Sequence, residues 1–516
     1  MTLESCWQCG APPTEATTAT ASTKSQPLLD LSHLLASNDT PLDSEISFIC
    51  DVISEGKGLV DALSSQIDNL EAVVARLIRK RDEMAQLVCQ HRAILSPVRR
   101  VPPELVCDIL ALSLSSNDDD TEIKPPWHLG HICGSWRRAV LGYPALWSFI
   151  IIPSYFPSDR RPPLPMIETQ LIRSADVPLS VCWSSNRDGD LPGLHALDLV
   201  VSHSHRWRRL LLHISHPNVW LDWLRTAGGR LAALETFELG GHYTRIPDIL
   251  STAPSLCKVF LMDRNFGASP PAPAIPWGQI THYAGSFTAD SQVEIVRRAP
   301  NLVSCAIGFP DWVDSFARGE PVVLPRLRRL RIEMAGFLPR LQAPLLQELF
   351  CSCSTMLHGQ SEILPFVERS ACSLQTLSLM RCSIDFDLIA VLRGLKSLTH
   401  LIIEDQDERD DDSPQITLFD DLAGDLCPNL TSLAYGFASA FSRSSRSHFF
   451  AMAQSRFQHE TPGPRFIRLR LFRSRYYSPG EACPPSIAVA IQNICDDGFD
   501  AGFVEPNEFE GKHFFS

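Results

Sequence analysis

The sequence predicts an α plus α/β protein, in which a helical N-terminal part precedes a long α/β solenoid. Two observations lead to this fold class. Apolar residues recur with heptad spacing between Ile46 and Val88, as they do along one face of a long helix. Between Trp207 and Phe466, a leucine-containing phrase recurs about every 26 residues, which is typical of proteins that stack strand-and-helix units.

Composition limits the function classes. The chain has 516 residues, of which 44% are hydrophobic and 20% are charged, enough for about two to four globular domains. Its formal net charge is -13, from 59 acidic and 46 basic side chains. An acidic surface repels nucleic acid and anionic membranes, so neither is an expected partner. No apolar run approaches the roughly 20 residues that span a bilayer. The longest run, Leu146 to Ile152, is interrupted by Ser148 and is predicted to be a strand.

The N-terminal segment is rich in Thr, Ser, Ala and Pro, and residues 1–42 are predicted to be a disordered tail because they offer little apolar surface to bury. The first 25 residues lack the basic start and apolar stretch of a secretory signal. An intracellular location, cytoplasmic or nuclear, is therefore expected, with reduced cysteines. The lone pair Cys6 and Cys9 has no second Cys or His pair at a suitable distance, so no metal site is expected.

Residues 45–93 are predicted to form a long helix, because two positions of each heptad are apolar and form one stripe. Arg81 interrupts this stripe, and Gly56 and Gly58 weaken its first part, which leaves residues 60–88 as the firm segment. Two interpretations remain. The helix forms a coiled coil that self-associates or holds a partner, or it packs on its own neighbouring domain.

Residues 94–150 are predicted to form a small helical motif. Pro102 and Pro103 lead into a helix, because a proline in the first helical turn loses no hydrogen bond. Glu104 suits the positive end of the helix dipole. Leu105, Ile109 and Leu112 then share one face at helical spacing.

A second helix is expected to follow an acidic loop at residues 115–122. It presents Leu129, Ile132, Cys133 and Trp136, again at helical spacing. The motif closes on Pro144, Leu146 and Trp147.

These blocks, in this order, resemble the F-box motif. The strings are Val101-Pro-Pro-Glu-Leu-x-x-x-Ile-Leu110, Leu129-x-x-Ile-Cys-x-x-Trp-Arg137 and Pro144-x-Leu-Trp147. The resemblance is greatest to F-box-like proteins of mushroom-forming fungi, in which a heptad helix leads into a Ser-Pro-x-Arg-x-Pro-Pro-Glu segment like residues 96–104. Two features depart from the pattern: Val101 replaces the usual Leu, and the acidic loop lengthens the gap between the helices.

The resemblance implies a binding surface for a Skp-type subunit of a Skp–cullin–F-box ubiquitin ligase. The side chains that form or support this surface would be Pro102, Pro103, Leu105, Ile109, Leu110, Leu129, Ile132 and Trp136. Some of them must be internal core, and the sequence does not separate these from contact residues. The resemblance also implies that the rest of the chain selects a protein substrate, with no catalytic residue of its own.

Residues 166–480 are predicted to form an irregular leucine-rich-repeat-like solenoid. The stretch Leu374-Gln-Thr-Leu-Ser-Leu-Met-Arg-Cys382 fits the repeat pattern without a mismatch. Looser copies begin at Trp207, Leu234, Leu256, Ile280, Leu302, Leu327, Leu346, Leu398, Leu430 and Phe466. Each phrase should supply a strand with its leucines facing inward. The positions between the leucines should face outward, as at Gln375, Thr376, Ser378, Arg328, Arg329 and Arg331. The alternative is an ordinary leucine-rich α/β domain.

Two acidic segments are expected to lie outside the packed structure. The run at residues 404–412 carries too much like charge to pack and is predicted to be a solvated loop. Residues 481–516 are predicted to be a C-terminal tail.

The chain contains no phosphate loop, nucleophile elbow, metal-binding His-Glu-x-x-His or dinucleotide fingerprint. No enzyme activity and no cofactor are therefore expected. The leading hypothesis is a ligase adaptor that joins a Skp-type subunit to a protein substrate. The alternative is an interaction scaffold outside the ligase that uses the coil and the repeats.

Overall fold

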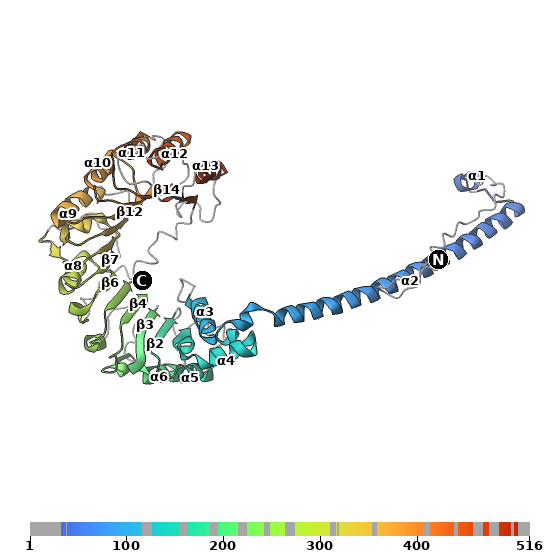
Figure 1. Cartoon of the computed structure of the whole chain (residues 1–516), viewed down its shortest axis with the longest axis horizontal. Coiled ribbons are helices and arrows are strands. Elements are labelled where there is room, and N and C mark those ends of the chain that lie inside the picture. Colours follow the sequence, from blue (N-terminus) through green and yellow to red (C-terminus); the bar gives the residue numbers. More distant parts are fainter. Residues whose placement is uncertain are drawn as a thin grey trace. The chain divides into compact units, whose positions relative to one another are not determined.

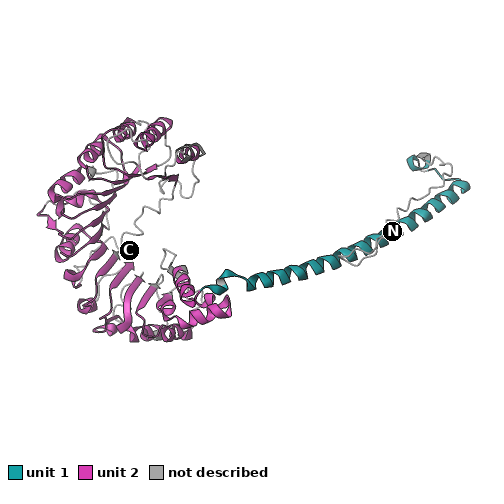
Figure 2. Ribbon diagram, in the orientation of Figure 1, with its two compact units in different colours: residues 1–101 teal, residues 102–516 magenta. Residues whose placement is uncertain are grey.

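The computed structural model describes sixteen stretches of the chain. They are residues 32–37, 39–115, 126–153, 164–185, 194–214, 224–241, 248–263, 274–309, 316, 319–352, 359–405, 413–437, 442–457, 468–473, 485–496 and 500–503. The chain divides into two compact units, residues 1–101 and residues 102–516 (Figure 2). The predicted acidic loop at residues 115–122 lies outside the described residues except for Ser115.

Unit 1 consists mainly of one helix. This helix, α2 (Asp43–Ile94), has 52 residues and covers the segment predicted at residues 45–93. At its start, the backbone N–H of Leu42 donates to Oε2 of Glu45 at 2.7 Å. A short helix, α1 (Ser32–Ala36), precedes it within the predicted tail, and a 3-10 turn, η1 (Pro97–Arg100), follows it. Residues 1–31 of that tail lie outside the described part of the chain.

Unit 2 contains a long parallel sheet. Within its described residues, fourteen strands pair in chain order, each hydrogen-bonded to the next. They are β1 (Phe149–Pro153), β2 (Leu179–Ser185), β3 (Trp207–Ile214), β4 (Thr236–Gly241), β5 (Lys258–Asp263), β6 (His282–Ser286), β7 (Ser304–Gly308), β9 (Arg329–Ile332), β11 (Glu348–Ser352), β12 (Thr376–Cys382), β13 (His400–Asp405), β14 (Ser432–Phe437), β15 (Arg468–Arg473) and β16 (Asp500–Phe503). Strands β8 (Val322–Val323) and β10 (Leu341–Gln342) form a separate parallel pair.

Helices cover one side of this sheet. The strands follow an arc, and the α-helices that connect them lie on its outer side (Figure 1). These helices are α5 (Leu164–Arg173), α6 (Leu194–Ser202), α8 (Ala289–Arg298), α9 (Ile363–Ser370), α10 (Phe386–Gly394), α11 (Ser413–Ala423), α12 (Arg443–Phe457) and α13 (Pro485–Asp496). The connections also contain the 3-10 helices η4 (Ser204–Arg206), η5 (Arg225–Ala227), η6 (Asp248–Thr252), η7 (Trp277–Gln279), η8 (Ala335–Arg340) and η9 (Gly359–Glu362). The α/β class predicted for this part of the chain is confirmed.

The register of the strands explains how the apolar side chains of unit 2 come together in one core. Side chains alternate between the two faces of a strand, so residues at equivalent positions of neighbouring strands form rows across the sheet. One row on the helix side includes Leu349, Leu377, Leu401, Leu433 and Leu469, which are paired in register and almost completely buried. This row joins the buried helix residues in one continuous apolar cluster.

The first residue of each leucine phrase marks a recurring turn. The backbone N–H of Leu398 donates to the carbonyl three residues earlier, at Leu395, and the same bond occurs at Leu256, Leu302 and Leu430. The next backbone N–H in each phrase bonds sideways to the equivalent carbonyl of the preceding unit, as from Thr399 to Gln375. Each phrase therefore ends one turn and attaches its strand to the strand before it.

All eleven phrases coincide with strands. Ten of the strands begin two residues after the start of the phrase, and β3 begins at Trp207 itself. The sheet is longer than the predicted range of residues 166–480, because β1 precedes this range and β16 follows it. Strand β2 lies within the range but before the first phrase. The apolar run of β1, which we expected to be a strand, therefore begins this sheet.

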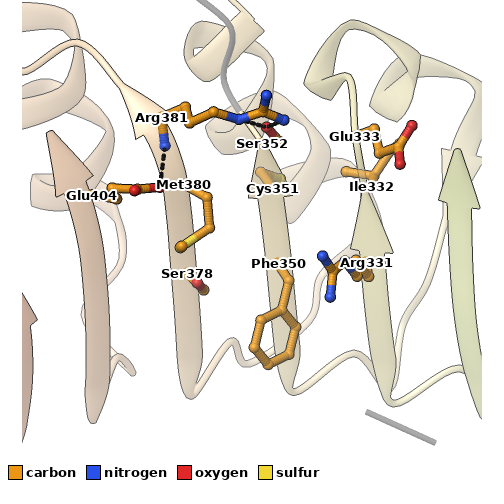
Figure 3. Close-up of a pocket in the computed structure, with 10 residues that line it drawn as sticks. All are labelled: Arg331, Ile332, Glu333, Phe350, Cys351, Ser352, Ser378, Met380, Arg381 and Glu404. Atoms are coloured by element: carbon orange, nitrogen blue, oxygen red, sulfur yellow. Dashed lines mark hydrogen bonds between the residues drawn. The ribbon is translucent and has the colours of Figure 1, made fainter. Parts of the chain in front are cut away.

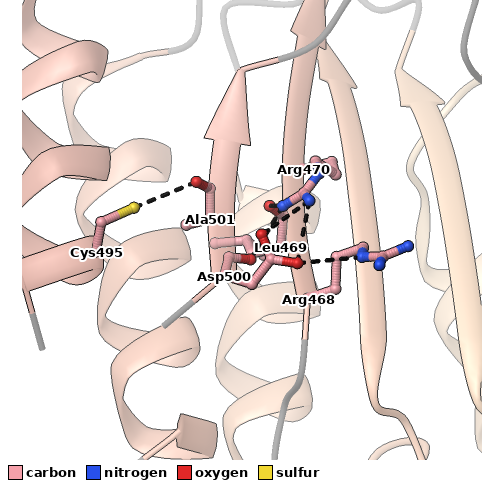
Figure 4. Close-up of polar contacts among 6 residues, drawn as sticks. All are labelled: Arg468, Leu469, Arg470, Cys495, Asp500 and Ala501. Atoms are coloured by element: carbon pink, nitrogen blue, oxygen red, sulfur yellow. Dashed lines mark hydrogen bonds and ion pairs between the residues drawn. The ribbon is translucent and has the colours of Figure 1, made fainter. Parts of the chain in front are cut away.

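The last strand corrects the prediction of a C-terminal tail. Strand β16 pairs with β15, and Asp500 forms ion pairs with Arg468 at 3.3 Å and Arg470 at 2.8 Å (Figure 4). The hydrogen bond from Arg470 lowers the pKa of the Asp500 carboxyl. The thiol of Cys495 in α13 lies 3.2 Å from the carbonyl oxygen of Ala501. An acidic composition did not prevent pairing here, because the neighbouring strand supplies the opposite charges.

Buried arginines tie neighbouring units together. The guanidinium of Arg456 in α12 is almost completely buried. It donates to the carbonyl oxygens of Leu422, in the last turn of α11, and of Leu426 and Cys427 beyond its end. Arg206 donates in the same way to the carbonyl oxygens of Ser174 and Val177 after α5. Both arginines thus satisfy carbonyl groups that a helix end leaves without partners.

The prediction that the acidic run at residues 404–412 is a solvated loop is wrong in part. Glu404 and Asp405 are buried at the end of β13, although we predicted a solvated loop. The Glu404 carboxylate accepts the backbone N–H of Arg381, and Asp405 accepts hydrogen bonds from Tyr435 and Gln415. These donors offset the cost of burying the two carboxylates. Residues 406–412 lie outside the described part of the chain.

The structure makes the stability of unit 2 depend on pH through His282 in β6. Burial and the neighbouring positive charges of Lys258 and Arg329 lower the pKa of His282 from 6.5 to about 4. The unfolded chain therefore binds more protons than the folded chain between these two values. We expect the stabilisation to be complete above pH 6.5 and to be lost as the pH falls towards 4.

Urea unfolding across this pH range tests the expectation. The free energy of unfolding of the unsubstituted protein should decrease as the pH falls, and His282→Gln should make this decrease smaller. His400→Gln is the matched control, because His400 occupies the equivalent position of β13, also follows a threonine, and is exposed. An equal effect of both substitutions on the pH profile would contradict the assignment to His282.

Candidate functional site

Helix α3 (Pro103–Ser115) buries one of its sides. The carbonyl of Pro102 accepts the first helical hydrogen bond, from the N–H of Val106 at 3.1 Å. Val106, Cys107 and Leu110 are buried, and the Cys107 thiol lies 4.0 Å from the carbonyl oxygen of Ala139 in the next helix. This side of α3 therefore belongs to the core of the helical motif.

The opposite side of α3 is apolar and exposed. Leu105, Ile109 and Leu112 expose 52%, 50% and 69% of their surfaces. Their spacing of four and three residues places them on one line along the helix, and we call these three residues the α3 stripe. An exposed apolar line beside a buried one is the pattern of a helix that packs on both sides, once on its own core and once on a partner.

The second helix of the motif is broken, in contrast to the prediction. A 3-10 helix, η2 (Pro126–His131), contains Leu129, and α4 (Gly134–Gly142) contains Trp136. Between them Cys133 has an extended backbone, with φ -161° and ψ 170°. Gly130 and Gly134 flank this break and favour helix weakly, so the apolar spacing alone did not reveal it.

A cluster of rings attaches the motif to the first helix of the sheet region. Trp147 in η3 (Pro144–Trp147) is almost completely buried, and its indole N–H donates to the carbonyl of Val140 at 2.8 Å. Trp127 packs edge-on against it, with ring centroids 4.8 Å apart. The guanidinium of Arg173 in α5 lies over both rings, 4.5 Å and 4.8 Å from their centroids. These contacts fix the motif against the sheet region within unit 2.

The structure separates the eight predicted site residues into two groups. Leu110 and Leu129 are core residues, with 1% and 7% of their surfaces exposed. The other six reach the surface: Pro102, Pro103, Leu105, Ile109 and Ile132 are exposed, and Trp136 is half-buried. Leu112 and Leu141 are also exposed, and only the helical spacing of Leu112 could have indicated its place in this surface.

A second candidate lies on the sheet face that the helices leave open. A pocket of about 240 Å³ extends across β9, β11, β12 and β13 (Figure 3). Its lining residues combine charged, aromatic and sulfur-containing side chains. They are Arg331, Ile332, Glu333, Phe350, Cys351, Ser352, Ser378, Met380, Arg381 and Glu404.

An unusual backbone conformation positions the polar end of the pocket. Arg381 has a φ of 53°, a left-handed conformation that is uncommon for a residue with a side chain. It accompanies an irregularity in the pairing of β12 with β13. The Arg381 guanidinium donates to Oγ of Ser352 at 2.7 Å, and its backbone N–H donates to Glu404 at 3.2 Å. A strained residue beside a pocket is a frequent feature of binding sites.

Ser378 lies deeper in the same pocket. As predicted, it faces away from the helix side of the sheet, where Leu377 and Leu379 are buried, but it is completely covered. Its register partners on the two neighbouring strands, Phe350 and Ile402, have larger side chains. Among the described residues, the Ser378 hydroxyl has no hydrogen-bond partner, and its burial closes it off from solvent. The sequence held no signal for the roles of Arg381 and Glu404.

Both surfaces carry groups that can contact a partner. The pocket offers guanidinium groups and carboxylates around a phenyl ring, a combination that can form polar and apolar contacts with a ligand. Among the described residues, no group of three His, Cys, Asp or Glu side chains could hold a metal ion. No described helix combines the length and the apolar character needed to cross a membrane. No protein-family model matches the chain, and no curated protein is similar to it.

Removal of the Ser378 hydroxyl tests whether this group lacks a partner in the folded chain. An unpaired buried hydroxyl contributes nothing to folding, so Ser378→Ala should leave the free energy of unfolding unchanged or raise it slightly. Ser174→Ala is the control, because the buried Ser174 hydroxyl bonds to Leu171 and Arg206, and this change should cost about 1–2 kcal/mol. A loss for Ser378→Ala as large as for Ser174→Ala, measured by urea unfolding, would disprove the assignment.

Proposed function

We propose that the chain is the substrate-recognition adaptor of a Skp–cullin–F-box type ubiquitin ligase. In this proposal, the helical motif binds the Skp-type subunit and the sheet region, a leucine-rich-repeat-like solenoid, binds a protein substrate. The adaptor acts by proximity, since it raises the effective concentration of the substrate beside a conjugating enzyme. It needs no catalytic residue, and it requires an intracellular location, cytoplasmic or nuclear.

The α3 stripe carries this proposal. Leu105 and Ile109 belong to the string that resembles the F-box motif, and half of each side chain is exposed. Exposed leucine and isoleucine side chains at one line of a helix are the kind of residues that anchor protein interfaces. The six exposed or half-buried residues of the predicted site are therefore available to a partner, while Leu110 and Leu129 support them from the core.

The sheet region supports the second half of the proposal. The coincidence of all eleven phrases with strands favours a repeat protein over an ordinary leucine-rich domain. Its open face carries the pocket between Arg331 and Glu404, which provides polar groups for recognition of a substrate segment.

A scaffold outside the ligase is the second candidate function. It is favoured by the long exposed apolar face of α2, which could join proteins without a Skp-type subunit. The two candidates differ in one respect that can be measured, namely whether the α3 stripe binds a Skp-type subunit.

Titration of the full chain with a purified Skp-type subunit tests the proposal. We expect micromolar or tighter binding that depends on the α3 stripe. The double variant Leu105→Ala and Ile109→Ala should weaken binding by about 2–4 kcal/mol, or roughly 30- to 700-fold, because two apolar anchors are lost.

Ile172→Ala is the matched control. Ile172 lies on α5 outside the motif and is 71% exposed, so its truncation should leave the affinity unchanged. Circular dichroism checks that each variant is folded. A folded chain that does not bind at micromolar concentration would favour the scaffold, and so would binding that the double variant leaves intact.

A further inference from the structure

Within the described residues of unit 1, helix α2 leaves a long apolar face uncovered. Sixteen large apolar side chains of this helix each expose 39% or more of their surface. They are Ile46, Val52, Ile53, Leu59, Val60, Leu63, Ile67, Leu70, Val73, Val74, Leu77, Ile78, Met84, Leu87, Val88 and Ile94. Isolated helices are marginally stable in water, and a helix of 52 residues gains most of its stability by packing an apolar face. The face therefore requires a partner.

The spacing of these residues fits a helical partner. We call the heptad position of Ile46, Ile53, Val60, Ile67, Val74 and Val88 the first position. The fourth position is then occupied by Ile49, Leu63, Leu70, Leu77 and Met84. First and fourth positions are the seam of a coiled coil. Arg81 occupies the first position, and Gly56 and His91 occupy the fourth, so the seam has three defects.

The charges of α2 are divided between its two halves. Residues 43–71 contain seven acidic side chains and one lysine, whereas residues 72–94 contain five basic and two acidic side chains. A parallel pair of such helices would place like charges side by side. An antiparallel pair places the acidic half of each helix beside the basic half of the other, which is favourable at separations within a Debye length of about 8 Å.

The antiparallel arrangement also brings the apolar first and fourth positions of the two copies together. When two copies overlap along the whole of Asp43–Ile94, residue 43 of one copy faces residue 94 of the other, and the two residue numbers of every facing pair sum to 137. In this alignment Ile53 faces Met84, Val60 faces Leu77, and Val74 faces Leu63. Every first position faces a fourth position of the other copy, as antiparallel coils require. Only about one alignment in seven has this property, because the heptad repeats every seven residues.

The defects of the seam face residues that accommodate them. Arg81 faces Gly56 of the second copy, where the missing side chain leaves room for the arginine. His91 faces Ile46 at the two ends of the pair. The three defects are thus confined to the outer layers of the pair, and the central layers between Val60 and Leu77 are apolar throughout.

We propose that α2 pairs with α2 of a second copy of this chain, antiparallel and over its full length. The two Ile94 residues then lie at opposite ends of the pair, about 76 Å apart for a rise of 1.5 Å per residue. Each end leads into its own unit 2, so one assembly presents two substrate-binding regions. The inference is independent of binding to a Skp-type subunit.

Two native cysteines allow a direct test on the full chain. Cys50 and Cys89 are both exposed and lie about 58 Å apart along one helix, too far for a short bismaleimide to link them within one chain. In the antiparallel pair, Cys89 of the second copy lies about two residues, or 3 Å, along the axis from Cys50. The two cysteines also occupy the same flank of the seam.

The expected product is a peptide that links Cys50 of one chain to Cys89 of another, identified by mass spectrometry of the cross-linked dimer. Cys50→Ser and Cys89→Ser should each abolish this peptide. A dimer that contains only Cys50–Cys50 or Cys89–Cys89 links would overturn the proposal in favour of a parallel pair. So would a chain that sediments as a monomer or as a trimer at micromolar concentration.

A substitution in the central layers provides the second measurement. Ile67 faces Leu70 twice in the pair, so Ile67→Lys buries two lysines near the centre and should yield monomers in analytical ultracentrifugation. Ser65→Lys is the matched control, since Ser65 lies on the outer side of α2, and it should remain paired. Unchanged association of Ile67→Lys would contradict the proposed register.

Discussion

Unit 2 depends on the burial of apolar side chains between the helix side of its parallel sheet and the helices themselves. No strand of this sheet could bury its apolar residues alone, because each short strand is covered only when its neighbours and their helices are in place. Leu377 and its register partners illustrate the constraint, since the row continues across five strands without a polar residue. The turns, the sideways hydrogen bonds and the buried arginines all maintain this register.

A scaffold that is held in this way can display groups that contribute nothing to its own stability. The α3 stripe and the strained backbone at Arg381 both belong to this class. The apolar face of α2 is the equivalent feature of unit 1. Each of these groups is costly or neutral in the free chain, and a partner is the simplest physical reason for its presence.

The repeating strands could be predicted because the leucine phrase contains both their buried rows and the turn before them. Strands β1, β2 and β16 lack the phrase, so only an apolar run indicated β1 and nothing indicated the others. Which of the eight predicted site residues are core and which reach the surface depends on packing contacts that the sequence does not reveal. Leu105 and Leu110 are both apolar residues of one helix, yet only Leu110 is buried when the motif packs. The pocket could not be predicted, since its residues come from four strands.

The central claim is that the α3 stripe, rather than another surface, receives the Skp-type subunit. Hydrogen–deuterium exchange of the full chain, with and without a saturating Skp-type subunit, tests it most directly, because backbone exchange reports which segments a partner covers. The account predicts slower exchange in residues 102–112 and 129–136, and no change in residues 329–404. Protection of residues 43–94 or 329–404, with none in residues 102–112, would contradict it.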